Sequence, residues 1–94
     1  MAMTLAEKII AKAACREKVA AGEIVTCAVD LAMIHDSSGP RRQAPRLEEL
    51  GVHVWDPSKV ILITDHYVPA TDAVSASILK ITRDWAKQEK IQHF

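Results

Sequence analysis

The chain has 94 residues, of which 49% are apolar, and its twelve basic side chains are balanced by twelve acidic ones. This zero net charge excludes the strongly basic surface that nucleic-acid binding requires, so we expect no nucleic-acid partner. The sequence contains no apolar run of about 18 residues or more, so we also expect no membrane partner.

The size fits one small domain or fragment over residues 1–94, because a chain this short buries only about 60% of its unfolded surface. The start of the chain has the pattern of an amphipathic helix and lacks the apolar core of a secretory signal, so we expect no such signal. Cys15 and Cys27 are not spaced as a CxxC motif, which gives no reason to expect a metal site. Two unpaired cysteines fit a reducing compartment, so we expect a cytoplasmic protein.

The first element predicted along the chain is a helix over about residues 5–14. Thr4 and Glu7 have the spacing of a capping box, in which each side chain binds the other residue's backbone amide. Leu5 and Ile9 share a stripe with Lys12 and Ala13, and charged residues occupy the rest of the surface. We interpret this segment as a packing helix with a solvated face.

The next element is an apolar stretch, VTCAVDLAMI, which predicts a strand near residues 24–32. This stretch leads directly into His35, Asp36, Ser37 and Ser38. The later apolar run at residues 60–64, which ends at Asp65, is typical of a parallel strand covered on both faces. Polar residues at its end are then candidates for a ligand site, because ligands bind at the carboxyl ends of such strands.

A second helix is expected to begin at Pro40, because a proline in the first turn removes an amide that has no helical partner. Ser37 and Ser38 are candidate cap residues, Leu47 and Leu50 should face the sheet, and Gly51 should end the helix.

Arg41 and Arg42 lie at the start of this helix, where a cation opposes the helix dipole. A bound dicarboxylate or tricarboxylate would explain both arginines, since amide donors and guanidinium groups favour anions. The alternative, which we prefer from the sequence alone, is that both arginines are simply solvated surface charges.

The second predicted strand covers residues 60–64 and runs into Asp65 and His66. If the two strands are parallel neighbours, His35 and His66 lie at the same edge of the sheet. Asp65 can orient the imidazole of His66 and hold its proton, as general acid catalysis requires. The alternative is that Asp65 caps the following loop and His66 is an ordinary loop residue.

A long helix follows Pro69, with Thr71 or Asp72 as its cap. Four apolar residues at spacings of four, three and four predict a continuous stripe facing the sheet: Val74, Ile78, Ile81 and Trp85. Trp55 is expected to pack as well, and residues 91–94 resemble the beginning of another strand. The predicted fold class is therefore α/β, a small partial parallel sheet with βαβα order after an N-terminal helix.

The segments LAEKII, VDLAMIHDSSGP, EELGV and VWDPSKVILITDHYVPA resemble the N-terminal portion of the aconitase superfamily. The resemblance is greatest to the large subunits of 3-isopropylmalate dehydratase and homoaconitase, and it covers nearly the whole chain in order. It implies an aconitase-like domain and an iron-sulfur hydro-lyase that moves a hydroxyl between adjacent carbons of a hydroxy acid. One iron of a 4Fe-4S cluster acts as the Lewis acid in such enzymes.

By this resemblance His66 is the proton donor to the leaving hydroxyl and Asp65 is its partner. His35 matches a substrate-contacting position that holds glutamine in true aconitases. The cluster cysteines belong to later segments, so we expect that this chain alone binds no cluster. The implied partners are the remainder of the large subunit or a cluster-bearing chain, a separate small subunit, and a small hydroxy acid.

Three hypotheses for function follow. The chain is part of a hydro-lyase large subunit, or it is a small subunit of a split hydro-lyase, or it is a non-catalytic binding domain that keeps the fold. Retention of both histidines weighs against the third hypothesis, since a scaffold needs neither.

Overall fold

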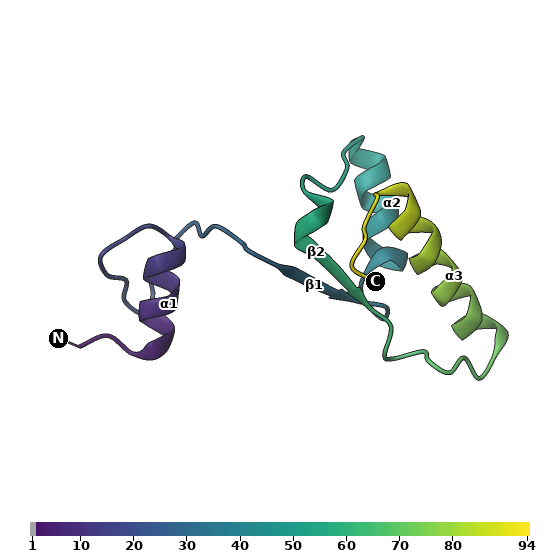
Figure 1. Ribbon diagram of the computed structural model, residues 1–94, viewed down its shortest axis with the longest axis horizontal. Coiled ribbons are helices and arrows are strands. Elements are labelled where there is room, and N and C mark those ends of the chain that lie inside the picture. The colour runs from purple at the N-terminus through teal and green to yellow at the C-terminus, as the bar shows by residue number, and fades with distance from the viewer. Residues whose placement is uncertain (1) are drawn as a thin grey trace. The chain divides into compact units, whose positions relative to one another are not determined.

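A computed structural model describes residues 2–94, and its elements follow the order α1, β1, α2, β2, α3 (Figure 1). This is the βαβα order predicted after an N-terminal helix. The chain forms two compact units, and the boundary between them in the sequence lies between Asp30 and Leu31. No helix within residues 2–94 combines the length and the apolar character needed to cross a membrane.

The first unit is built on α1, Leu5–Ala13. The predicted capping box is present: the Glu7 amide donates to Thr4 Oγ1 at 3.2 Å, and the Thr4 amide donates to Glu7 Oε2 at 2.7 Å. The predicted packing stripe is wrong within this chain, because Leu5 and Ile9 are exposed and Ala11 is the buried helical residue. So short a unit offers the larger side chains little apolar surface to pack against.

The second unit contains a parallel pair of strands, β1 (Ala32–His35) and β2 (Val60–Ile63). The prediction that the two strands are parallel neighbours is confirmed. The predicted first strand is placed too early, since residues 24–29 run into β1 without strand pairing. A strand needs a partner for its backbone groups. The register pairs Ala32 with Val60, so earlier residues lie beyond the start of β2.

The core of this unit lies between β2 and the end of α3, Ala73–Gln88. Its buried apolar residues are Val60, Leu62, Trp85, Ala86 and Ile91. The helix α2, Pro40–Leu50, contacts α3, and its Leu47 packs against this core. Leu50, which was expected to face the sheet, is exposed.

The buried stripe of α3 is rotated from the predicted one. Ile78 and Trp85 are buried as predicted, whereas Val74 and Ile81 are exposed. The inward positions between and beside the two buried residues are taken by Ser75, Thr82 and Ala86. Thr82 can be buried because its hydroxyl donates to the Ile78 carbonyl at 2.9 Å. Asp72 caps this helix, as predicted, by accepting from the Ser75 amide.

Trp55 does not pack in the core as predicted. Its side chain is 89% exposed, with the ammonium group of Lys59 5.5 Å from the ring centroid. The prediction of a further strand at the end of the chain is confirmed at a single position. There His93 forms a parallel bridge with Ile61 and accepts from the Leu62 amide at 2.8 Å.

Candidate functional site at the carboxyl ends of the two strands

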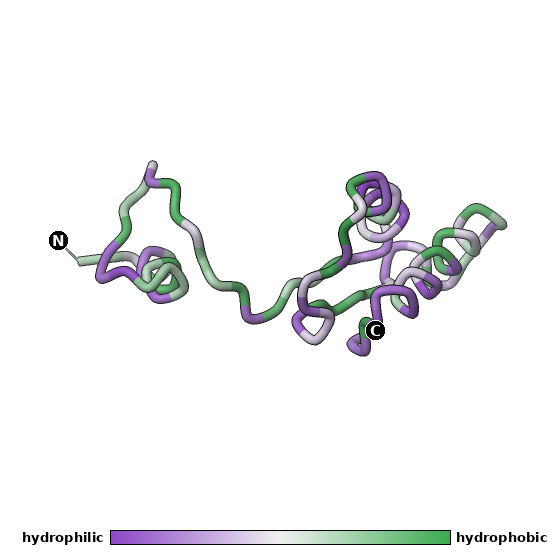
Figure 2. Tube along the Cα trace, turned by 90° about the horizontal axis from the view of Figure 1, so that it is seen from above, coloured by the Kyte–Doolittle hydropathy of each residue, from purple (hydrophilic) through white to green (hydrophobic). Residues whose placement is uncertain are grey.

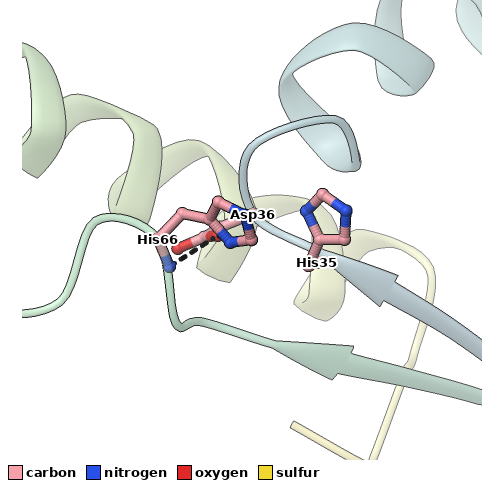
Figure 3. A group of neighbouring side chains, drawn as sticks. All are labelled: His35, Asp36 and His66. Atoms are coloured by element: carbon pink, nitrogen blue, oxygen red, sulfur yellow. Dashed lines mark hydrogen bonds and ion pairs between the residues drawn. The ribbon is translucent and has the colours of Figure 1, made fainter.

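The ends of β1 and β2 are joined just beyond their regular pairing. The Asp36 amide donates to the Ile63 carbonyl at 3.1 Å, which extends the parallel ladder by one residue. His35 and His66 therefore meet at one edge of the sheet, as predicted (Figure 3). Their imidazole rings stack with centroids 4.6 Å apart and planes inclined by 16°.

Two serines of the turn after β1 hold the His35 ring. Ser37 Oγ lies 2.8 Å from Nδ1, and Ser38 Oγ lies 3.3 Å from Nε2. The prediction that these serines cap α2 is wrong, because the N-cap is Gly39, which provides no side-chain hydrogen bond. The serines are therefore used to fix the orientation of His35.

Gly39 makes this turn possible by its lack of a side chain. Its amide donates to the His35 carbonyl at 2.9 Å. A Cβ at position 39 would come within 2.4 Å of both that carbonyl oxygen and a methyl carbon of Ile34. The turn therefore requires glycine because of close approach, and the helix begins at Pro40 as predicted.

The imidazole of His66 is bound through Nδ1 to the carboxylate of Asp65 at 2.6 Å. This hydrogen bond raises the pKa of His66, and the negative charges of Asp65 and Asp36 add to the effect. The same hydrogen bond lowers the pKa of Asp65. With Nδ1 facing the carboxylate, Nε2 is the ring nitrogen left to exchange a proton with a bound molecule, and the His66 side chain is about half exposed.

Asp36 is the residue of this site whose role the sequence analysis missed. Its side chain is completely buried, and its two oxygens accept from the His66 and Tyr67 amides, each at 3.2 Å. Its Oδ1 also lies 3.4 Å from His66 Nδ1. The sequence did contain a signal, since an adjacent His and Asp lie at the end of β1 and again just beyond β2.

The two arginines differ in their relation to the site. The guanidinium carbon of Arg41 lies 5.9 Å from the ring centroid of Tyr67, the residue that follows His66, which places Arg41 at the margin of the cluster. Arg42 is exposed on α2, and its amide donates to the Gly39 carbonyl. The structure thus brings His35, Asp65 and His66 together and leaves Arg42 at the surface.

Atoms of His35, Asp36 and His66 that could bind a metal lie within 4.8 Å of one another. These side chains are already engaged within the protein: both Asp36 oxygens accept from amides, His66 Nδ1 faces Asp65, and the serines hold His35. The Asp65–His66 pair is an arrangement in which an imidazole can hold and exchange a proton.

An iron-sulfur cluster does not fit the residues of this chain. Such clusters are held by several cysteine thiolates. The two cysteines of the chain, Cys15 and Cys27, both belong to the first unit, and the Cys27 thiol donates to the Ile10 carbonyl at 3.8 Å.

Fold and site together define an α/β segment with an acid-base cluster at the carboxyl edge of a parallel sheet. No family model matches the chain. Curated relatives match it over its whole length. They include "3-isopropylmalate dehydratase large subunit 1" from Methanopyrus kandleri, 45% identical over 95 residues, and the large subunit from Desulfitobacterium hafniense, 42% identical over 95 residues.

The match covers 22% of each of these two relatives and all of the present chain. The chain thus spans about a fifth of the length of the curated relatives it matches, and the matched region is an N-terminal segment. The chain belongs to the family of 3-isopropylmalate dehydratase large subunits, as a segment of such a subunit, and the predicted family is confirmed.

Proposed function

We propose that this chain is the N-terminal portion of a hydro-lyase that acts on 2-hydroxy dicarboxylic or tricarboxylic acids such as isopropylmalate, and that it is incomplete by itself. The observation that carries the proposal is the Asp65–His66 pair at 2.6 Å, set at the carboxyl edge of the sheet. The names of the relatives supply the reaction class and the substrate.

The reaction removes a hydroxyl from one carbon and a proton from its neighbour, which leaves a carbon-carbon double bond and one molecule of water. In this proposal a base outside this chain accepts the carbon-bound proton. Hydroxide is a poor leaving group, so the departing oxygen must receive a proton. His66 Nε2 donates this proton in the proposed mechanism, and in the reverse direction it takes a proton from the attacking water. Because Asp65 raises the pKa of His66, the imidazole is charged over a wider pH range.

In this proposal His35, Arg41 and Arg42 bind the substrate. His35 lies against the His66 ring and is held by two serines, so it can contact the molecule that His66 protonates. Arg41 is close enough to the Tyr67 ring to approach a carboxylate beside the cluster. Arg42, exposed on the next position of the helix, would attract the same anion at longer range.

The complete enzyme, as we propose it, carries a 4Fe-4S cluster on cysteines outside this chain, and its partners are the remainder of the large subunit and a separate small subunit. Exposed apolar side chains support a covering partner. Ile24 is fully exposed and Met33 of β1 is 64% exposed, and the segment leading into β1 is largely hydrophobic (Figure 2). We also propose a role in leucine biosynthesis and a cytoplasmic location, which two free thiols fit.

Anaerobic reconstitution tests the proposal. The chain is combined with iron and sulfide, alone and together with a separately expressed remainder of a large subunit and a small subunit, and the unsaturated acid is followed by its ultraviolet absorbance. We expect activity on isopropylmalate only in the complete mixture, and no stoichiometric iron on the chain alone. Inactivity with all hydroxy acids, under conditions where an uninterrupted large subunit is active, would contradict the proposal.

The same experiment separates the alternatives. Partners encoded as independent polypeptides that restore activity would indicate a split enzyme. Stoichiometric iron and sulfide on the isolated chain, lost in Cys15→Ser or Cys27→Ser variants, would show that this segment holds a cluster of its own.

A further inference from the structure

The proton-transfer role assigned to His66 leaves one buried acid at the site without a function. Asp36 follows β1 directly and is completely buried. A buried carboxylate is unfavourable unless hydrogen bonds compensate for the loss of water. An apolar residue at position 36 would avoid this cost. The presence of a buried aspartate therefore points to a role in the site.

The hydrogen bonds of Asp36 fix the backbone that carries His66. One carboxylate oxygen accepts from the His66 amide at 3.2 Å (Figure 3), and the other accepts from the Tyr67 amide at 3.2 Å. Two consecutive amides that point at one carboxylate define the local conformation of the turn after β2. The amide of Asp36 is itself bound to Ile63, so the ends of both strands are tied through this one residue.

The same carboxylate also faces the His66 ring. The charged and titratable groups around this imidazole are Asp65, with Oδ1 at 2.6 Å from Nδ1, Asp36, with Oδ1 at 3.4 Å from Nδ1, and the stacked ring of His35. The Asp65 side chain is more than half exposed, whereas the Asp36 side chain is buried and accepts from two backbone amides.

We infer that Asp36 is the positioning residue of His66: it holds the turn after β2 so that Nδ1 faces the two carboxylates and the ring lies against His35. The catalytic part of this inference rests on the proposed function, but the placement of the ring does not. Asp65 makes the shorter bond to the imidazole, and Asp36 determines where that imidazole is.

The test compares Asp36→Asn with Asp72→Asn. Both aspartates accept from backbone amides, but Asp72 caps α3 by binding the Ser75 amide at 2.7 Å, so its variant controls for general loss of stability. In Asp36→Asn the side-chain amide group can accept only through its oxygen, so one of the two backbone amides loses its acceptor.

The first readout is nitrogen and proton NMR of labelled histidines in the full 94-residue chain, which requires no enzyme activity. We expect Asp36→Asn to lower the titration midpoint of His66 by about half a pH unit or more and to weaken ring contacts with His35. Asp72→Asn should leave both unchanged. A folded Asp36→Asn chain with an unaltered His66 midpoint and unaltered His35 contacts would overturn the inference.

If Asp36→Asn does not fold, the same NMR measurement is made on Asp36→Glu. Glutamate retains the charge but extends the carboxylate by one methylene, so the His66 ring should be displaced from His35. Unchanged His66 signals in this variant would overturn the inference, and unfolding of both variants while Asp72→Asn folds would do so as well, because Asp36 would then be a requirement of the fold as a whole.

The second readout is kinetic, in the complete enzyme with its small subunit. Asp36→Asn should lower the turnover rate on isopropylmalate about tenfold or more, with a change in the Michaelis constant below about threefold, and should shift the pH profile. An inactive wild-type enzyme would refute the proposed function and leave the NMR result to decide the role of Asp36. If the wild-type enzyme is active and the Asp36→Asn variant has the same turnover rate and the same pH profile, the role of Asp36 is overturned and the proposed function is not.

Discussion

The imidazole rings of His35 and His66 stack at a centroid distance of 4.6 Å, although His35 ends β1 and His66 lies just beyond β2. The carboxylates of Asp65 and Asp36 both face the His66 ring. The hydrogen bond to Asp65 and the two negative charges raise the pKa of His66 and so favour its charged form.

The first prediction concerns the ion pair of Asp65 and His66. The pKa of His66 is raised, so its contribution to stability is complete below the ordinary histidine pKa and is lost as pH rises through the raised value. The pKa of Asp65 is lowered, so the same interaction is lost as pH falls through the lowered value. The pair therefore stabilises the chain most between about pH 4 and about pH 6.5.

Asp65→Asn should remove this pH-dependent stabilisation and lower the His66 titration midpoint. Histidine NMR across this pH range measures the midpoint, and denaturant unfolding at several pH values measures the stability. Asp84→Asn is a suitable control, because its carboxylate pairs with Lys80 on α3, outside the cluster. An unchanged His66 midpoint in Asp65→Asn would show that the hydrogen bond does not persist in solution.

The second prediction concerns Gly39 and the placement of His35. Gly39→Ala should destabilise the second unit by about 1–3 kcal/mol, because the added Cβ would overlap the His35 carbonyl and Ile34. Gly51→Ala is a matched control: its backbone is left-handed, with φ of 67°, but a Cβ there has open space.

The measurement combines urea unfolding with histidine NMR. Both alanine variants should lose stability, since a left-handed alanine is itself strained. Only Gly39→Ala should also move the His35 signals. Wild-type His35 signals in Gly39→Ala would show that the turn relaxes without disturbing the ring.

The third prediction compares the two tryptophans. Trp85 is 5% exposed and belongs to the core, so Trp85→Ala should cost about 3–5 kcal/mol, which is enough to unfold so small a unit. Trp55→Ala should cost less than about 1 kcal/mol, because the side chain is largely exposed and contacts Lys59. Circular dichroism during thermal unfolding distinguishes the two, and equal losses of stability would contradict the assignment of the core.

The sequence was sufficient to predict what depends on local pattern and strand ends. The parallel pairing, the capping box at Thr4, the start of α2 at Pro40 and the meeting of His35 with His66 are all present. These features depend on residue type and on short spacings, both of which can be read directly from the sequence.

The errors arose where a partner elsewhere in the molecule decides the outcome. The first strand begins at Ala32 because β2 offers pairing for only four residues. Ile81 and Val74 are exposed because Thr82 and Ser75 occupy the inward positions of α3. Neither the length of pairing that β2 offers nor the inward face of α3 can be inferred from the apolar periodicity of one segment.

The role of Asp36 was missed for a related reason. Its hydrogen bonds reach amides thirty and thirty-one residues later in the chain, so nothing in the spacing around Asp36 indicates them. A polar residue directly after a buried parallel strand is a general signal for a site, but it does not say whether the side chain binds a ligand or the protein itself.

The most direct test of the central claim is the turnover rate of His66→Ala in the complete dehydratase that contains this segment. A proton donor acts mainly in the transition state, so we predict a fall of at least about a hundredfold with normal cluster content. His53→Ala is the control, since His53 is exposed and pairs with Glu89 rather than with the cluster. Near-normal turnover in a His66→Ala enzyme that retains its cluster would contradict the assignment of His66 as the proton donor.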